Sequence, residues 1–275
     1  MDRRSIFFLT IVLTVIVLAV FVARKIDKRG GVPAVKKADT AVPAAVEKST
    51  PVVALVLDDF GYTRRNLEAL RKIDVPVTLA VLPNVPYTHK VCAFAGKNGQ
   101  EVILHLPMEP ESGEAHLEQD TIRADMDDAS VRRIIARDLD SVSSAKGASN
   151  HMGSKATKNR RLMKVVLGDL KERNMFFLDS LTTRESECGR VARELDIPYA
   201  KRDIFIDNEL DPGHIRKQME KLERLALANG KALAIGHDRA VTIEVLREVV
   251  PKMSEKGIRF VTLSDYIGSE KTGGE

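Results

Sequence analysis

Six consecutive apolar residues, Val52–Leu57, run directly into two adjacent aspartates, Asp58 and Asp59. A short, unbroken apolar run is typical of a strand that is buried on both faces. Such strands occur in parallel sheets covered by helices, and these folds place their chemistry at the carboxyl ends of the strands. Two neighbouring carboxylates repel each other when both are ionised. A bound cation would relieve this repulsion, so the pair is a candidate metal site.

The chain beyond Pro51 alternates between short apolar runs and helical stretches, with a period of roughly 25–40 residues. This alternation predicts βα units with right-handed crossovers. Seven or eight such units favour an α/β fold of the (β/α) barrel type over an open sheet. Polar residues follow nearly every predicted strand, and these strand ends would meet at one rim: Asp58, Asp59, His105, His151, Asp179, Asp207 and His237.

Three of the six histidines, His105, His151 and His237, follow predicted strands. A single histidine in such a place is most often a hydrogen-bonded structural residue. Three at equivalent positions, facing two aspartates, favour a metal site instead. Two imidazoles and one carboxylate form a usual ligand set for catalytic zinc, which keeps one position open for water. The metal activates the water and polarises a carbonyl oxygen, while the second carboxylate is free to act as general base.

The basic charge of the chain lies outside this predicted barrel. The formal net charge is +4. Residues 1–50 contain nine Lys and Arg against four Asp and Glu, a charge of +5, so residues 51–275 sum to −1. A nucleic-acid-binding domain would itself be basic, so we expect no nucleic-acid partner.

The apolar stretch Ile6–Ala23 is long enough, at about 1.5 Å per residue, to cross a bilayer core as a helix. A basic cluster follows it where a signal-peptidase site would stand, which favours a transmembrane anchor, residues 1–23, over a cleaved signal peptide. Residues 24–50 predict a flexible linker, 51–267 the globular domain and 268–275 a disordered tail. The flanking charges do not settle orientation, and counting alone tilts towards a cytoplasmic domain.

Six short segments of the globular part carry a resemblance to a known family. In chain order they are LVLDDFGY, LHLPMEP, NHMGS, FLDS, RDIFID and AIGH. Together they resemble the divergent polysaccharide deacetylase family, relatives of the carbohydrate esterases that remove N-acetyl groups from sugars. The resemblance covers about Pro51–Ile267 and implies a (β/α) barrel, a glycan substrate and a divalent metal ion, with zinc expected. It also implies a periplasmic domain tethered to the inner membrane of a Gram-negative type cell.

The resemblance further implies roles for the aspartate pair and the last histidine. In the wider deacetylase superfamily the first aspartate of the pair is the catalytic base and the second is a metal ligand. These roles fall on Asp58 and Asp59. His237 resembles the superfamily's late histidine, which protonates the leaving amine.

The metal histidines depart from the superfamily pattern, in which both usually come from one His-x-x-x-His motif after the third strand. Here His105 is followed at the matching position by Glu109. We therefore expect His151, after the next strand, as the third ligand, and Glu109 as the alternative. The family often has two asparagines before this histidine. Here Asn150 is kept and Ser149 replaces the first.

Four further residues are expected around the site. Asp179 could orient a histidine by accepting its N–H, or it could cap a helix. Asp207 and Arg202 look like rim architecture or substrate contacts. The chain has no tryptophan, so Tyr62 is a candidate platform for a sugar ring, and the alternative is packing beneath its loop.

The expected function is metal-dependent removal of N-acetyl groups from a cell-envelope polysaccharide or glycan. Two alternatives stay open. One is a catalytically weak or inactive barrel of the same kind that binds glycan or a protein partner in the periplasm. The other is a metal-dependent amide or ester hydrolase with a different substrate, because the same rim chemistry serves any acyl transfer.

Overall fold

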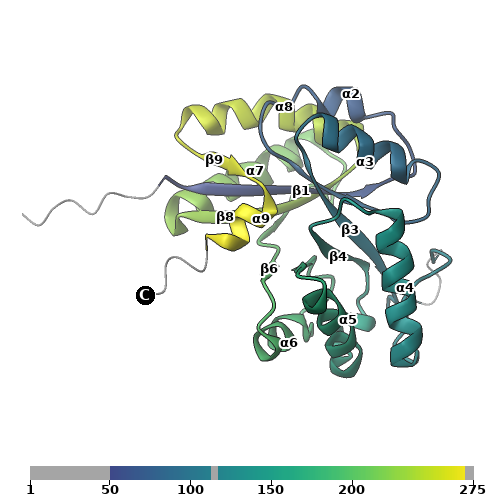
Figure 1. Ribbon diagram of the computed structural model, residues 1–275. Helices are drawn as coiled ribbons and strands as arrows, with labels where there is room; N and C mark the ends of the chain where they lie inside the picture. Colours follow the sequence, from purple (N-terminus) through teal and green to yellow (C-terminus); the bar gives the residue numbers. More distant parts are fainter. Residues whose placement is uncertain (1–49, 113–116, 270–275) are drawn as a thin grey trace, which may run out of the picture. The chain divides into compact units, whose positions relative to one another are not determined.

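The computed structural model describes residues 50–112 and 117–269 of the chain. In this part, nine strands form one parallel sheet with helices packed around it (Figure 1). The strands are β1 (Val52–Phe60), β2 (Thr78–Val81), β3 (Glu101–Met108), β4 (Gly147–Met152), β5 (Phe176–Asp179), β6 (Tyr199–Lys201), β7 (Ile204–Phe205), β8 (Lys231–His237) and β9 (Arg259–Val261). The helices are α2 (Leu67–Leu70), α3 (Thr88–Lys97), α4 (Asp128–Ser141), the 3₁₀ turn η1 (Ala156–Lys158), α5 (Arg160–Glu172), α6 (Cys188–Leu195), α7 (Pro212–Asn229), α8 (Ala240–Glu255) and α9 (Leu263–Gly268).

The strands lie in the order β6-β5-β4-β3-β2-β1-β8-β7, and β9 pairs with the first residues of β1. The sheet is a half-barrel, because no ladder within the described ranges joins its end strands β6 and β7. Only Arg202 and Asp203 separate these two strands, whereas parallel pairing requires a crossover of about a dozen residues or more. The prediction of a parallel α/β fold is thus confirmed, but the barrel is open at this point.

The central strand β1 is buried on both faces, as its unbroken apolar run predicts. Val53, Leu55 and Leu57 pack among the helices on one side of the sheet. Ala54 and Val56 belong to a smaller cluster on the other side, to which α9 contributes. All five residues are fully buried, and each large aliphatic side chain contributes about 2 kcal/mol. The core thus fixes where β1 ends and where its two aspartates lie.

Capping residues in the sequence define the ends of the longer helices. The Asp127 carboxylate accepts a hydrogen bond from Ser130 N at the start of α4. Asp211 accepts one from His214 N at the start of α7, and α7 ends at Gly230, whose φ of 78° is left-handed. These caps define where α4 and α7 begin and where α7 ends.

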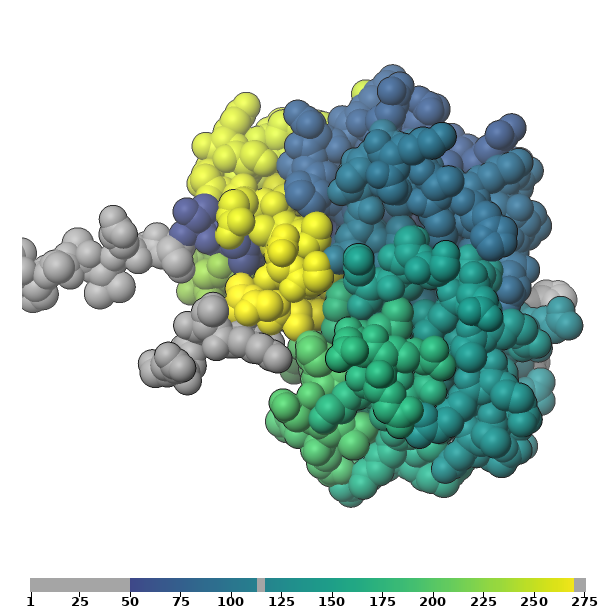
Figure 2. All heavy atoms as spheres, viewed as in Figure 1, coloured from purple at the N-terminus to yellow at the C-terminus, as the bar shows by residue number. Residues whose placement is uncertain are grey.

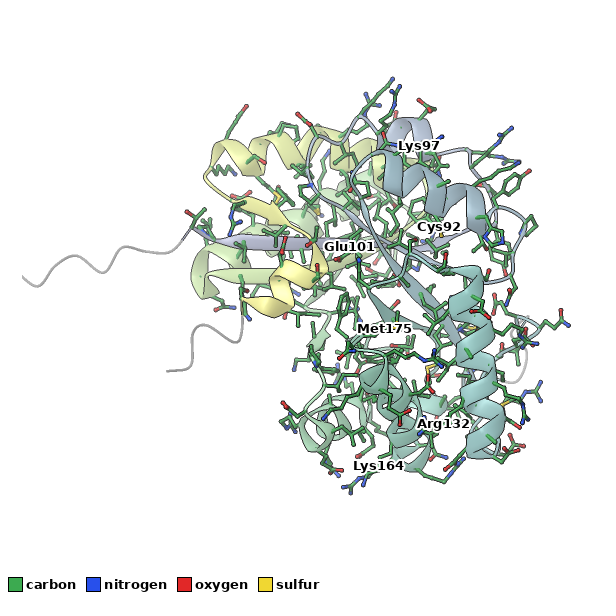
Figure 3. The ribbon with its side chains drawn as sticks, in the orientation of Figure 1. Cys92, Lys97, Glu101, Arg132, Lys164 and Met175 are labelled. Carbon is green, nitrogen blue, oxygen red and sulfur yellow. The ribbon has the colours of Figure 1, made fainter. Side chains whose placement is uncertain are left out.

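Ion pairs join α4 and α5 on the outside of the sheet. Arg132 Nη1 lies 3.2 Å from Asp169 Oδ1 and 3.0 Å from Glu172 Oε2. Figure 3 shows Arg132 on α4 beside α5, and Figure 2 shows that side chains of α3, α4 and α5 cover much of this face. Cys92 on α3 and Cys188 on α6 are both free thiols.

Some of the expected features lie outside the described residues. These are the membrane anchor, nearly all of the linker and most of the C-terminal tail. Within the ranges that the structure covers, no helix is both long enough and apolar enough to cross a membrane.

Candidate metal centre

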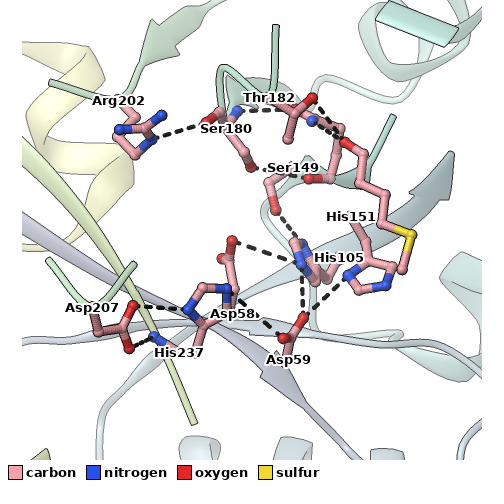
Figure 4. Close-up of polar contacts among 12 residues, drawn as sticks. Asp58, Asp59, His105, Ser149, His151, Ser180, Thr182, Arg202, Asp207 and His237 are labelled. Carbon is pink, nitrogen blue, oxygen red and sulfur yellow. Dashed lines mark hydrogen bonds and ion pairs between the residues drawn. The ribbon is translucent and has the colours of Figure 1, made fainter. Parts of the chain in front are cut away.

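The two aspartates at the end of β1 lie at a β-bulge. Leu57 pairs with Leu79 of β2 and Phe60 with Val81, so three steps along β1 match two steps along β2. Asp59 has a φ of 65°, in the left-handed region that non-glycine residues rarely adopt. In a regular strand, adjacent side chains point to opposite faces. The extra residue changes this direction, and both carboxylates approach one histidine (Figure 4).

Asp59, His105 and His151 form a group that could hold a metal ion. His105 Nε2 lies 3.3 Å from Asp59 Oδ1, and His151 Nδ1 lies 3.1 Å from the same oxygen. One ligand atom from each residue lies within 4.8 Å of the others. The two imidazole rings pack edge to face, with their centroids 4.9 Å apart. Two imidazole nitrogens and one carboxylate oxygen match the donor set of catalytic zinc sites, so these residues fit a divalent ion.

The second ring nitrogen of each of these histidines also has a polar neighbour. Ser149 Oγ lies 2.8 Å from His105 Nδ1, because the pairing of β3 with β4 places these two residues side by side. Glu118 Oε1 lies 3.4 Å from His151 Nε2. The His105 contact is a hydrogen bond, whereas His151 Nε2 and Glu118 lie at an ion-pair distance without hydrogen-bond geometry. A polar partner that holds the proton on the outer nitrogen leaves the inner nitrogen available for a metal ion. The donors are therefore oriented for an ion on the Asp59 side of both rings.

Glu118 is not among the predicted site residues, because it follows no predicted strand. Its Oε1 accepts a hydrogen bond from Tyr62 Oη at 2.8 Å, besides lying near His151. Although its burial opposes the effect, interactions with His151 and Tyr62 lower the pKa of Glu118 to about 2. Burial also opposes protonation of His151, yet its contacts with Asp59 and Glu118 raise its pKa to about 9. Tyr62 is 48% exposed, so it does not pack beneath its loop.

Asp58 and Asp59 differ in their electrostatic environment. Burial raises the pKa of Asp58, although the nearby His105 opposes this effect. Asp58 is 3% exposed, and its Oδ1 has no hydrogen-bond partner. Burial acts on Asp59 as well, but hydrogen bonds and charges from His105 and His151 outweigh it and hold the pKa of Asp59 well below its usual range. Asp59 is therefore the anionic member of the pair, and Asp58 is the one suited to take up a proton.

His237 faces the same group from β8 and is oriented by Asp207. Its Nδ1 lies 2.8 Å from Asp207 Oδ1, and its backbone N–H donates to Oδ2 at 2.9 Å. Thr242 Oγ1 donates to the same Oδ2 at 2.6 Å. Burial opposes protonation of His237, but the hydrogen bond and charge of Asp207 raise its pKa. The free nitrogen, Nε2, lies 3.8 Å from Asp59 Oδ2, so His237 presents it to the centre.

Glu109 and Asn150 contact the loops around the centre. Glu109 accepts hydrogen bonds from Lys155 Nζ at 2.7 Å and from Ala124 N at 2.9 Å. Both of its oxygens are therefore engaged away from Asp59, whereas the alternative ligand role would require one to be free. Asn150 Oδ1 accepts a hydrogen bond from Ser180 N at 2.9 Å, which ties β4 to the loop after β5.

Asp179 and Arg202 also hold this loop. Asp179 accepts hydrogen bonds from Leu181 N at 2.8 Å and from Ser186 Oγ at 2.6 Å. It begins no helix, since α6 starts at Cys188. The orienting contact expected for Asp179 is instead made by Asp207, on His237. Arg202 Nε donates to the Ser180 carbonyl at 2.9 Å, which agrees with the rim position expected for it.

A family model described as divergent polysaccharide deacetylase matches residues 55–267. The chain belongs to this family. The uncharacterized protein YibQ of Escherichia coli (strain K12) is 36% identical over 214 residues, which cover 76% of this chain and 67% of YibQ. The resemblance stated from the six sequence segments is confirmed.

Solved structures share the fold of this member of the divergent polysaccharide deacetylase family. The uncharacterized protein ATU2773 from Agrobacterium tumefaciens C58 superimposes with a TM-score of 0.75 at 22% identity, covering 79% of this chain and 89% of that one. The catalytic domain of a peptidoglycan N-acetylglucosamine deacetylase from Eubacterium rectale ATCC 33656 superimposes with a TM-score of 0.50 at 13% identity, covering 78% and 88%.

In this member of the divergent deacetylase family, the candidate ligands come from three strands. Asp59 lies on β1, His105 on β3 and His151 on β4. The two histidines meet because β3 and β4 are neighbours in the sheet, with Pro107 paired to His151. Adjacent strands thus bring together two imidazoles that lie 46 residues apart in the sequence.

Proposed function

We propose that this chain is a metal-dependent hydrolase that removes N-acetyl groups from a saccharide of the cell envelope. The observation that carries the proposal is the arrangement around Asp59. Its two histidine neighbours, His105 and His151, complete a ligand set. Asp58 and His237 reach the same centre and have pKa values raised above their ordinary ones, which suits a base and an acid.

Asp59, His105 and His151 would hold the metal ion, and zinc matches their donor set best. When bound, the ion polarises the amide carbonyl and stabilises the negative charge that develops on its oxygen. Asp58 accepts a proton from the water that attacks the carbonyl carbon. The unpaired and buried Asp58 Oδ1 supports this role, because a carboxylate oxygen without a donor is free to take the proton.

His237 completes the reaction by donating the proton on its Nε2 to the sugar nitrogen as the C–N bond breaks. Acetate and a free amine are then the products. The Asp207 carboxylate at His237 Nδ1 supports this role, since it fixes the ring and stabilises its protonated form. Both proposed catalytic residues lie within 4 Å of a proposed metal ligand. Asp58 is this close to His105, and His237 is this close to Asp59.

A glycan of the cell wall is the proposed substrate. Membership of the deacetylase family supports a glycan, and one protein that shares the fold is a peptidoglycan N-acetylglucosamine deacetylase. The apolar stretch Ile6–Ala23 supports a membrane anchor. Membership of the deacetylase family supports a periplasmic position of the domain, which would make the anchored membrane the inner one. A reporter fused to the C-terminus and active only in the periplasm would test this location.

The activity is tested by acetate release from N-acetylglucosamine oligomers and from peptidoglycan fragments. We expect release that stops on treatment with a chelator and returns with added zinc. Asp58→Asn should abolish release yet bind metal as the unmodified protein does. Asp140→Asn, an exposed change on α4, is the control and should be fully active. Metal binding without acetate release would contradict the proposal and favour a non-catalytic glycan-binding role.

A further inference from the structure

The sheet has an open edge at β6. Phe177 N of β5 donates to the Pro198 carbonyl, and a carbonyl of β5 accepts from Arg202 N. Bonds to one neighbouring strand come from every second residue, so the peptide groups of Tyr199 and Lys201 point away from β5. No strand in the described ranges pairs with that side of β6. Two N–H groups and two carbonyls therefore face the seam where the barrel is open.

A cavity of about 620 Å³ lies along this seam. All three residues of β6 line it, together with Lys231 at the start of β8 and Tyr266 on α9. Residues of α6 form another part of its wall, and Figure 1 shows β6 between α6 and α9. Pockets that hold a ligand usually measure about 300–1,000 Å³, so the cavity has room for a short stretch of chain.

The wall of the cavity is positively charged. Five basic and two acidic side chains line it: Arg184, Arg190, Arg193, Lys201, Lys231, Asp179 and Asp203. Both acids already accept hydrogen bonds. Arg184, Arg193 and Lys201 are exposed, and none of them has an acidic partner in the part of the chain that the structure covers. Guanidinium groups stay charged and bind carboxylates through two parallel hydrogen bonds, so an acidic partner would find accessible cations here.

The two faces of β6 have different surroundings. Tyr199 packs on the helix side of the sheet, where a Cβ on Gly189 of α6 would lie 3.2 Å from its Oη. Lys201 shares this face, because every second side chain of a strand points the same way. Ala200 points to the other face and belongs to the apolar cluster that contains Tyr266. A strand added to β6 would alternate in the same way, with one set of side chains towards the cations of α6 and the other towards an apolar surface.

We propose that the open edge of β6 binds an extended peptide in which acidic and apolar residues alternate. The peptide adds as a further strand, and its backbone pairs with the peptide groups of Tyr199 and Lys201. Its carboxylates pair with Arg184, Arg193 and Lys201, while its apolar side chains face α9. An acidic glycan would meet the same cations but has no regular row of amides to pair with β6. The site goes beyond the proposed function, since none of the proposed metal ligands lines the cavity.

Binding is tested with two synthetic hexapeptides of equal composition, blocked at both ends. One alternates three glutamates with three valines, and the other has the glutamates in one block followed by the valines. Calorimetry on the full chain, at neutral pH and fixed ionic strength, gives both affinities. We expect the alternating peptide to bind at least about tenfold more tightly, because only this peptide has all its charge on one face of a strand. A galacturonic acid trimer, with three carboxylates and no amides, should also bind at least about tenfold more weakly than the alternating peptide.

Variants locate the site. Arg193→Glu on α6 and Lys201→Glu on β6 should each lower affinity for the alternating peptide at least about tenfold, because each replaces attraction by repulsion. Either variant serves if the other fails to fold. Arg224→Glu on α7 is the matched control, since Arg224 is also exposed and lies outside the cavity wall, and it should bind the peptide as the unmodified chain does. Backbone pairing has its own measurement: hydrogen exchange of the Tyr199 and Lys201 amides should slow at least about tenfold on saturation with the peptide.

Equal affinity for the two hexapeptides would overturn the inference, and so would amides at Tyr199 and Lys201 that exchange as fast with the peptide as without it. An equal loss in Arg224→Glu and Arg193→Glu would overturn it as well, because it would show attraction to the whole surface. A galacturonic acid trimer that binds as tightly as the alternating peptide would replace the peptide by an acidic saccharide. None of these measurements depends on acetate release, so their failure would leave the proposed function unaffected.

Discussion

Replacing Asp138 with asparagine should change the stability of the protein in a pH-dependent way. Compared with the unmodified chain, the variant should gain free energy of unfolding as the pH rises from acid to neutral. Asp138 is fully buried, with one oxygen bonded to Asn84 and the other without a partner. Burial and the charge of Asp120 raise its pKa from 3.8 to about 7, and Arg137 opposes this only in part. The folded protein therefore holds a proton on Asp138 that the unfolded chain releases.

The sign and size of the effect follow from this difference in proton binding. Below the unfolded pKa both states carry the proton, so the group does not alter stability. Between pH 3.8 and about pH 7 only the folded state carries the proton on Asp138, so the free energy of unfolding of the unmodified chain falls as the pH rises. Above about pH 7 neither state carries the proton, and the free energy of unfolding falls no further on account of this group. Three pKa units correspond to about 4 kcal/mol. Asparagine has no such titration and can still accept the Asn84 hydrogen bond.

The measurement is urea unfolding of the unmodified chain and Asp138→Asn from about pH 4 to about pH 8. Tyrosine fluorescence follows the domain alone, because all four tyrosines lie beyond residue 51 and the chain has no tryptophan. We expect the stability difference between the two proteins to shift by about 2–4 kcal/mol in favour of asparagine. The exposed Asp140→Asn should show no such shift. A difference between Asp138→Asn and the unmodified chain that stays constant with pH would refute the argument.

Other substitutions test the centre and the core. Glu118→Gln should weaken zinc binding about 10–100-fold in a chelator competition, because the partner of a ligating histidine loses its charge; unchanged affinity would show that Glu118 does not orient it. Asp207→Asn should lower kcat for acetate release about 10²–10⁴-fold while metal content stays the same, since the proton donor loses its partner; full activity would remove that role. Gly147→Ala should lower the free energy of unfolding by about 1–3 kcal/mol, because its Cβ would lie 2.4 Å from the Phe176 ring. Gly168→Ala on α5, with nothing within 4 Å, is the matched control and should be neutral or stabilising by up to about 1 kcal/mol; an equal loss in both would contradict the steric argument.

The main side chains of the centre could be predicted because apolar runs mark strands, and the carboxyl ends of parallel strands lie together. Asp58 and His237 illustrate this, since they are separated by most of the domain in sequence and are paired in register across β1 and β8. Periodicity identifies the end of each strand without any knowledge of which strands are neighbours. For that reason the rim could be predicted, but not the partner of each residue on it.

The positions of Asp207 and Glu118 could not be predicted from the periodicity of the sequence. Asp207 lies beside His237 because β7 pairs with β8 at a constant offset, with Ile204 opposite Ala234. A strand of two residues gives too little pattern to predict that register. Glu118 reaches His151 from a polar connection between β3 and α4. Such a segment has neither strand nor helix periodicity, so its position depends entirely on tertiary contacts.

The aspartate pair itself shows how local strain determines the chemistry of the centre. In a regular strand, Asp58 and Asp59 would point to opposite faces, and only one could reach the histidines. The bulge and the left-handed φ of 65° at Asp59 place both within 4 Å of His105. A left-handed residue with a side chain costs about 1–2 kcal/mol, so packing of the rest of β1 must hold it in place. Two adjacent aspartates therefore differ in their environment. Asp58 is buried and has a raised pKa, whereas Asp59 is partly exposed and has a lowered pKa. Backbone geometry and burial thus distinguish the proposed base, Asp58, from the proposed ligand, Asp59, and the sequence of two adjacent aspartates alone does not reveal this difference.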